Sequence, residues 1–303
     1  MARRVALAAV ALGAASCVGA MSGQSPGGSE DAGDGGISRA DAAEGPADAG
    51  PEVLGPSAGC GREGARTGLQ SRTMMIRGRE RTYLRFIPAS YELNTPLALV
   101  ITLHGTANLA SFWRDVYDLE EQADGEAIFV YPNALPNANG ETKYQAFDRN
   151  SDDFAFVDAL IEEVEDDHCI DRDRVFVTGF SLGGTFAANL GCWRGEAFRA
   201  IAPVGAGGGP SVTPLSDCVG EVADWQAAGD EDAQHRPGSM FILDRYISAN
   251  GCADTRTETT PSGCYAYDSC RPETPTTWCN YPGGHEWPRM ATVGVWSFFA
   301  RFE

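Results

Sequence analysis

The chain has 303 residues, with 42 acidic and 23 basic side chains, and its formal net charge is −19. This charge excludes a generic nucleic-acid-binding protein, because phosphate contacts need clustered lysine and arginine side chains. A protein with several membrane spans is also excluded, because the only long apolar run lies at the extreme N-terminus. We therefore expect a globular protein with no nucleic-acid partner.

The N-terminus has the pattern of an export signal. Two arginines precede the apolar stretch Val5–Ser16, which is shorter than the about 20 residues of a membrane span but typical of a signal peptide. Cleavage after Ala20 would make residues 1–20 a signal peptide. Cleavage before Cys17 would instead leave a lipoprotein whose only membrane contact is a lipid on that cysteine. Both alternatives stay open, and both predict a protein that is secreted or lipid-anchored at the bacterial cell surface.

Residues 21–58 differ in composition from the rest of the chain. Of these 38 residues, 25 are glycine, alanine, serine or proline, and none is aromatic. Such a segment buries too little apolar surface to offset the entropy lost on ordering. We predict a disordered linker at 21–58, followed by a single folded domain at 59–303.

Apolar patterns between residues 59 and 303 alternate between strand-like and helix-like segments. Short β-branched and aromatic runs are typical of strands, and apolar spacing of three and four residues is typical of amphipathic helices. We predict strands at 72–76, 79–87, 97–103, 127–131, 174–178, 199–204, 222–227 and 276–281, and helices at 109–123, 152–167, 182–192, 240–250 and 289–302. The first two strands should form an edge hairpin around Gly78, and Asp152 should cap its helix. The alternation predicts an α/β fold, with a mostly parallel sheet and helices on both faces.

The segment Gly179-Phe180-Ser181-Leu182-Gly183-Gly184 carries the strongest chemical pattern. It stands between a predicted strand and a predicted helix, where Gly-x-Ser-x-Gly forms a sharp turn that exposes the serine at the sheet edge. Small residues are needed at Gly179 and Gly183, because chain segments pass closely there. We predict that Ser181 is a nucleophile and that the N–H of Leu182 faces a developing oxyanion.

A nucleophilic serine needs a base, and the chain has four histidines. In hydrolases with this turn the chain order is serine, acid, histidine, which leaves His235 and His285. His285 lies in a glycine-rich turn between the last predicted strand and helix, where such enzymes present their base. His235 lies in a polar stretch and is interpreted as a solvated loop residue. We predict that His285 is the base and that His104 has a structural role.

The acid should follow the predicted strand at 222–227, where Asp230 and Asp232 stand in one turn. Spacing alone prefers neither carboxylate. At the end of the strand at 97–103, the sequence His104-Gly105-Thr106 marks a second oxyanion donor, the backbone N–H of Thr106. Together these residues predict a serine hydrolase that forms an acyl-enzyme and needs no metal or organic cofactor.

Taken in order, five segments resemble the secreted feruloyl esterase and polyhydroxybutyrate depolymerase-like family of α/β-hydrolases, which includes carbohydrate esterase family 1. The segments are Leu103-His104-Gly105, Tyr131-Pro132, Asp173 to Gly184, Asn250-Gly251-Cys252 and Gly283 to Pro288. The resemblance covers about residues 60 to 303. It implies the α/β-hydrolase fold for the catalytic domain.

The resemblance also implies which aspartate is the acid. In the family the acid lies in a His-Gly-Thr-x-Asp turn, and the aligned stretch 228–232 puts it at Asp232, with Asp230 as the fallback. This turn departs from the family pattern, because an alanine replaces the histidine and the usual Val-Pro is missing. Glu286 also replaces the more usual threonine beside His285, and its carboxylate could raise the pKa of that histidine or disfavour anionic substrates.

Within the family, feruloyl and acetyl-xylan esterases cleave side-chain esters of plant polysaccharide, and depolymerases cleave hydroxyalkanoate polyesters. Polyester depolymerases often carry an added binding domain, and this chain ends after its last predicted helix, so we expect a carbohydrate-type esterase. A polyhydroxybutyrate depolymerase is the alternative. A catalytically inactive cell-surface binding scaffold is an alternative of another class, favoured only by the altered acid turn. Trp113, Tyr144 and Trp287 could stack on an aromatic acyl or sugar group, although core packing is the plainer interpretation. We expect a monomer.

The cysteines predict a disulfide-braced domain. Nine are present, and setting Cys17 aside leaves eight, an even number suited to four disulfides in an oxidising compartment. No C-x-x-C pair occurs among the last four, which argues against a zinc knuckle. Pairing cannot be read from the sequence. Our best expectation pairs Cys192 with Cys218, which flank one strand and loop, pairs the last four cysteines among themselves, and leaves Cys60 with Cys169.

Overall fold

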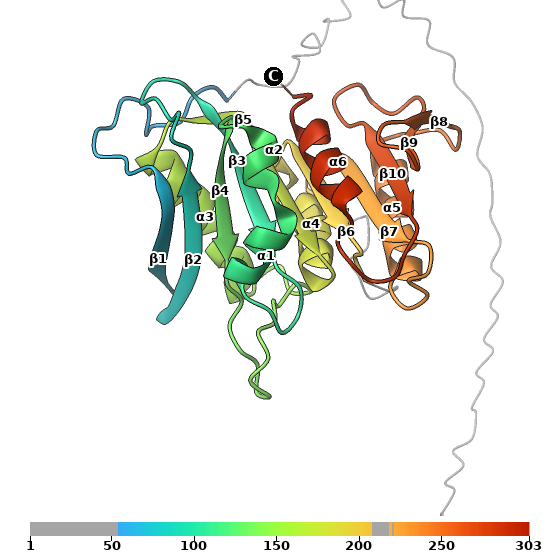
Figure 1. Ribbon diagram of the computed structural model, residues 1–303, viewed down its shortest axis with the longest axis horizontal. Helices are drawn as coiled ribbons and strands as arrows, with labels where there is room; N and C mark the ends of the chain where they lie inside the picture. Colours follow the sequence, from blue (N-terminus) through green and yellow to red (C-terminus); the bar gives the residue numbers. More distant parts are fainter. Residues whose placement is uncertain (1–53, 208–217, 220, 303) are drawn as a thin grey trace, which may run out of the picture. The chain divides into compact units, whose positions relative to one another are not determined.

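The fold is known from a computed structural model that describes residues 54–207, 218–219 and 221–302 (Figure 1). The predicted signal peptide, Cys17 and most of the predicted linker lie outside these residues. Within the described residues, the end of the predicted linker, 54–58, is ordered against the following domain: the N–H of Leu54 donates to Asp173 at 3.2 Å, and Ser57 is buried. Among the described residues, no helix is long and apolar enough to cross a membrane.

Within the described residues, ten strands form a single sheet in the order β1-β2-β4-β3-β5-β6-β7-β10-β9-β8. The strands are β1 (Gly68–Ile76), β2 (Arg79–Ile87), β3 (Leu97–Leu103), β4 (Ala127–Pro132), β5 (Ile170–Phe180), β6 (Ala200–Val204), β7 (Ala223–Gly229), β8 (Arg256–Thr259), β9 (Cys264–Tyr267) and β10 (Thr276–Tyr281). The strands from β4 through β10 in this order run parallel, and the pairs at both edges are antiparallel. The predicted mostly parallel sheet and its edge hairpin, β1–β2, are confirmed.

Helices cover both faces of the sheet (Figure 1). The helices are α1 (Ala110–Tyr117), α2 (Leu119–Ala123), α3 (Asp152–Asp167), α4 (Leu182–Trp193), α5 (Arg236–Ala249) and α6 (Arg289–Phe299), with a short 3₁₀ helix, η1 (Gly195–Ala197). The apolar core on one face joins α3, α4 and α5 to the sheet, and the core on the other face joins α1, α2 and α6. Strands β3 and β4 are almost wholly buried, as expected for parallel strands covered on both sides.

The structure corrects the predictions for three helices. The helix predicted at 109–123 is two helices, because Asp118 has a left-handed backbone with φ of 50° between them. Ser151, not Asp152, occupies the N-cap of α3, and Asp152 lies in the first turn. Helix α5 begins at Arg236, four residues before the predicted start, with a proline in its first turn.

Strands β8 and β9 were not predicted. They lie between residues 252 and 279, where the sequence has few apolar residues and no clear alternation. Long-range pairing with β10 and two disulfides hold this segment as an antiparallel extension of the sheet. The sequence pattern did not show this extension, because its pairing depends on partners outside the segment.

All four expected disulfides form. They are Cys60–Cys169, Cys192–Cys218, Cys252–Cys270 and Cys264–Cys279. The last joins directly opposed residues of β9 and β10. Because β10 leads into the turn that carries His285, this bond braces one support of the candidate site.

Candidate active site

Ser181 lies at the carboxyl end of β5, directly before α4. Its backbone has φ of 56° and ψ of −121°, a conformation that costs free energy in any residue with a side chain. The flanking glycines make this turn possible: a Cβ on Gly179 would lie 2.6 Å from the backbone of Gly183, and a Cβ on Gly183 would lie 2.6 Å from the carbonyl oxygen of His104. This strained strand-to-helix turn is typical of a nucleophile elbow.

A continuous chain of hydrogen bonds runs from Ser181 through His285 to Asp232. The Oγ of Ser181 lies 2.8 Å from Nε2 of His285, and Nδ1 of His285 lies 2.6 Å from Oδ2 of Asp232. The carboxylate of Asp230 pairs with a different residue: it is half-exposed and lies 3.2 Å from Arg236. The structure therefore brings Asp232, and not Asp230, to the histidine.

Two loops carry Asp232 and His285, and the backbone joins them. They follow the adjacent parallel strands β7 and β10. The N–H of Asp230 donates to the carbonyl of Tyr281 at 2.9 Å, and the N–H of Glu231 donates to that of Gly283 at 2.9 Å. A side chain at Gly229 would overlap the 283–284 backbone. The acid turn, although it departs from the family pattern, is thus fixed against the histidine turn.

His235 is not the solvated loop residue that the sequence analysis expected. Its N–H and its Nδ1 each lie 3.0 Å from Oδ1 of Asp232. Its ring stacks on the ring of His285, with centroids 3.7 Å apart. Asp232 therefore accepts hydrogen bonds on both carboxylate oxygens, from one histidine on each side. The Asp-x-x-His spacing before a helix with an early proline was the available sequence signal.

Burial and hydrogen bonds shift the pKa values of the pair in the direction that a base and its partner need. Burial would raise the pKa of Asp232, but hydrogen bonds from His235 and His285 outweigh it and lower that pKa. Burial lowers the pKa of His285, while the bond to Asp232 opposes this and the nearby His235 reinforces it. The pKa of His285 is lowered on balance, with burial as the largest cause, so the rise expected from Glu286 is not seen.

The two predicted oxyanion donors come from different segments: Leu182 follows Ser181 directly, and Thr106 follows strand β3. The N–H of Leu182 begins α4, and Thr106 lies in the exposed loop after β3, next to Gly105, whose added Cβ would lie 3.5 Å from that of Ser181. The N–H of Ala107 donates to the carbonyl of Thr142 at 2.8 Å, which fixes this loop. Leu182 is therefore next to the serine in the chain, and the loop of Thr106 approaches the serine through Gly105.

His104 supports the loop that carries Thr106, residues 104–109, which we call the oxyanion loop after its predicted role. Its Nδ1 donates to the carbonyl of Gly105 at 2.7 Å, and its Nε2 accepts from the N–H of Ala134 at 3.0 Å. Burial lowers the pKa of His104 to about 4. A ring that donates on one side and accepts on the other must be neutral, which fits the structural role expected for it.

The three predicted substrate-binding aromatics differ in exposure. Trp113 and Tyr144 are only 7% and 2% exposed, and Trp113 packs on Phe180 under the ring of His285. Trp287 is half-buried and packs on Tyr117. Trp113 can therefore support the ring of His285 through Phe180. Tyr144 instead packs on the ring of His104 and lines a neighbouring cavity, whereas Trp287 offers surface.

Sequence reasoning missed two apolar side chains near the oxyanion loop. Leu109 and Phe112 are 52% and 56% exposed and follow Thr106 by three and six residues. They were read only as part of a predicted helix. Their apolar character shortly after His104-Gly105-Thr106 in the sequence is the feature that could have marked them.

One group of possible metal ligands occurs among the described residues, and it coincides with the hydrogen-bonded chain. Ligand atoms of Asp232, His235 and His285 lie within 4.8 Å of one another. Both histidines already share Nδ1 hydrogens with the aspartate. A cation at this point would have to displace those protons, whereas the predicted chemistry uses them.

The sequence is similar to feruloyl esterases of fungi. It is 31% identical over 262 residues to probable feruloyl esterase C of Aspergillus niger, which covers 80% of this chain and 90% of that protein. It is 29% identical over 280 residues to feruloyl esterase D of Neurospora crassa, covering 82% and 91%. No protein-family model matches the chain.

The fold is similar to solved esterase structures. An acetyl xylan esterase from Aspergillus awamori superposes with a TM-score of 0.60 at 13% identity, covering 77% of this chain and 99% of that one. A ferulic acid esterase superposes with a TM-score of 0.55 at 21% identity, covering 78% and 98%. At these identities the likeness concerns the fold, which confirms the predicted α/β-hydrolase architecture.

Proposed function

Because the chain belongs to the feruloyl esterase family and is thus a carboxylic ester hydrolase, we propose that it hydrolyses feruloyl or acetyl-type esters of plant polysaccharide. The observation that carries the proposal is the unbroken chain from Ser181 to His285 to Asp232, with distances of 2.8 and 2.6 Å. The acyl class is supported by the feruloyl esterase relatives. The exposed Leu109 and Phe112 beside the oxyanion loop also support it, since an aromatic acyl group would find apolar partners there.

In the proposed reaction, His285 takes the proton of Ser181 at Nε2. The alkoxide attacks the ester carbonyl, and the N–H groups of Leu182 and Thr106 stabilise the tetrahedral oxyanion. His285 then protonates the leaving alcohol, and the acyl group stays on the serine. Water, deprotonated by the same histidine, releases the acid.

Asp232 holds the base in its working tautomer. With Nδ1–H of His285 donated to Asp232, Nε2 keeps a free lone pair toward Ser181. When the imidazolium forms, the carboxylate stabilises its charge without taking the proton. The lowered pKa of Asp232 keeps it ionised for this task.

The assembled contacts argue against the inactive-scaffold alternative. A chain kept only for binding has no need of a strained Ser181 within hydrogen-bond distance of a histidine. The four disulfides suit an oxidising extracellular compartment. Export by the predicted signal, with or without a lipid on Cys17, remains part of the proposal.

The test is hydrolysis of methyl ferulate by the full chain with its disulfides formed. We expect turnover by the wild type and a loss of at least about 10⁴-fold in kcat for Ser181→Ala. Ser262→Ala is the matched control, because this serine is exposed and lies in the turn between β8 and β9, at the edge of the sheet away from β5, and its activity should equal that of the wild type.

Two comparisons sharpen the outcome. If a hydroxybutyrate dimer is cleaved much faster than methyl ferulate, the substrate is a polyester and the polysaccharide ester is rejected. Equal rates for the wild type and Ser181→Ala, or no turnover of any ester and no labelling by a fluorophosphonate, would reject the serine mechanism.

A further inference from the structure

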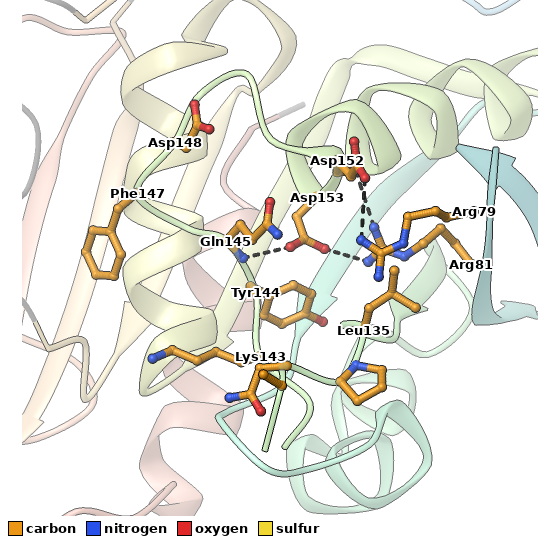
Figure 2. Close-up of a pocket in the computed structure, with 13 residues that line it drawn as sticks. Arg79, Arg81, Leu135, Lys143, Tyr144, Gln145, Phe147, Asp148, Asp152 and Asp153 are labelled. Atoms are coloured by element: carbon orange, nitrogen blue, oxygen red, sulfur yellow. Dashed lines mark hydrogen bonds and ion pairs between the residues drawn. The ribbon is translucent and has the colours of Figure 1, made fainter. Parts of the chain in front are cut away.

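A cavity of about 490 Å³ opens at the carboxyl edge of the sheet, apart from the residues of the proposed reaction. Its walls come from β2, the loop between β4 and α3, and the first turn of α3, and we call it the β2–α3 cavity (Figure 2). The volume falls within the roughly 300–1,000 Å³ typical of small-molecule sites. None of the proposed catalytic steps uses a residue of this cavity.

The floor of the β2–α3 cavity is a set of ion pairs. Arg81 and Asp153 are almost fully buried, with 2.5 Å between Nη2 and Oδ1. Asp153 also accepts from the backbone N–H of Gln145 at 2.7 Å, and Arg79 lies 3.7 Å from Asp152. These charges are already paired, so the floor is preorganised and adds no net charge.

Three side chains of the 143–147 segment remain available to a ligand. Lys143 is the only lysine of the chain. Within the described part of the chain, neither its ammonium nor the side-chain amide of Gln145 makes a hydrogen bond or ion pair. Phe147 is 51% exposed and stands at the side of the cavity opposite Arg79 (Figure 2). The cavity thus offers donors, an acceptor and one aromatic surface.

The charge balance selects the kind of ligand. The lining has three basic side chains, Arg79, Arg81 and Lys143, and three acidic ones. It is neutral overall, although residues 59–303 carry 20 basic and 35 acidic side chains, a net −15. Neither an anion nor a cation gains from such a lining. An uncharged, hydroxyl-rich ligand does, because hydroxyls both donate and accept, and the C–H face of a sugar ring packs on an aromatic face.

The position of the cavity relates it to Ser181. Strands β2, β4, β3 and β5 are consecutive neighbours, and adjacent strands lie about 4.8 Å apart. Strand β4 is therefore about 10 Å, and β2 about 14 Å, from the strand that carries the serine. The same loop also contacts the oxyanion loop, since Oγ1 of Thr142 donates to the carbonyl of Asn108 at 2.6 Å.

We propose that the β2–α3 cavity is a subsite for an uncharged sugar residue of the esterified polysaccharide, on the alcohol side of an ester held at Ser181. A separation of about 10 to 14 Å is bridged by a short oligosaccharide. The proposal rests on the proposed function for the identity of its substrate. It assigns the 143–147 segment a part in substrate selection.

Two substrates with the same acyl group test this on the full chain. Phe147→Ala should raise KM for a feruloylated arabinoxylo-trisaccharide about tenfold and leave kcat and KM for methyl ferulate unchanged. Lys143→Ala should raise KM for the trisaccharide ester less, and again only for that substrate. Leu69→Ala, an equally exposed apolar residue on β1, is the matched control and should change neither substrate. An equal change for both substrates, or no change for either, overturns the subsite.

Direct binding separates this subsite from the proposed function. Unesterified arabinoxylo-trisaccharide is titrated calorimetrically into Ser181→Ala protein, where millimolar binding that Phe147→Ala abolishes is expected. Binding without any ester hydrolysis by the wild type would uphold the subsite and reject the function. Hydrolysis of methyl ferulate without binding of the trisaccharide would uphold the function and reject the subsite. Tighter binding of a uronate-bearing oligosaccharide would overturn the uncharged assignment.

Discussion

The proposed nucleophile and its proposed base are held by two different kinds of structure. Ser181 stands in the middle of the sheet, where close backbone packing around Gly179 and Gly183 imposes its conformation. His285 stands in a turn that is held by polar contacts with the loop of Asp232 and by a ring stacked against it. The first arrangement is steric and tolerates little change. The second is closely packed against backbone only at Gly229 and otherwise depends on hydrogen bonds that can be removed singly, so the two sides should respond differently to substitution.

The largest effect is expected on the nucleophile side. A Cβ on Gly183 would overlap the carbonyl oxygens of Leu103 and His104, which are backbone atoms at the end of the buried strand β3 and cannot yield cheaply. Gly183→Ala should lower the free energy of unfolding by about 3 kcal/mol or more, or prevent folding. Denaturant unfolding measures this.

Gly284→Ala is the matched control from the base side. An added Cβ there meets no atom within 4 Å, so its free energy of unfolding should stay within about 0.5 kcal/mol of the wild type. Similar losses in both variants would remove the distinction between a steric and a polar support.

The same distinction explains what the sequence could and could not predict. The elbow at 179–184 could be predicted because its glycines and serine lie within six residues of sequence, and the turn needs those residue types at that spacing. The fold was readable because strands such as β3 are apolar along their length. His235 was misread, because its role depends on two loops that meet only in the folded chain. The β8–β9 extension was missed for the same reason, since its pairing partner and disulfides lie outside its local pattern.

A moderate effect is expected from His235→Ala. The variant loses the bond from Nδ1 to Asp232 and the ring stacked on His285, so the base should sample wrong orientations. We expect kcat to fall about tenfold to a hundredfold with KM little changed. Steady-state kinetics on methyl ferulate, with thermal unfolding alongside, checks this.

His235→Asn should recover much of that loss, because its amide can still donate to Asp232. The acid limb of the kcat/KM profile should also move to higher pH in His235→Ala, because His235 lowers the pKa of His285. An unchanged kcat, or a loss explained wholly by global unfolding, would mean that His235 does not position the pair.

The smallest effect is expected at Glu286. Only neutral His285 can accept the serine proton, so kcat/KM should rise with pH through the pKa of this histidine, which burial places below its ordinary value of about 6.5. The carboxylate of Glu286 lies back over Gly283 in its own turn, in an exposed residue, where water screens its charge. Glu286→Thr should therefore leave the acid limb where it is. If the carboxylate did raise the pKa of His285, its removal would move that limb to lower pH, opposite to the shift expected for His235→Ala, and the two pH–rate profiles measured together separate these outcomes.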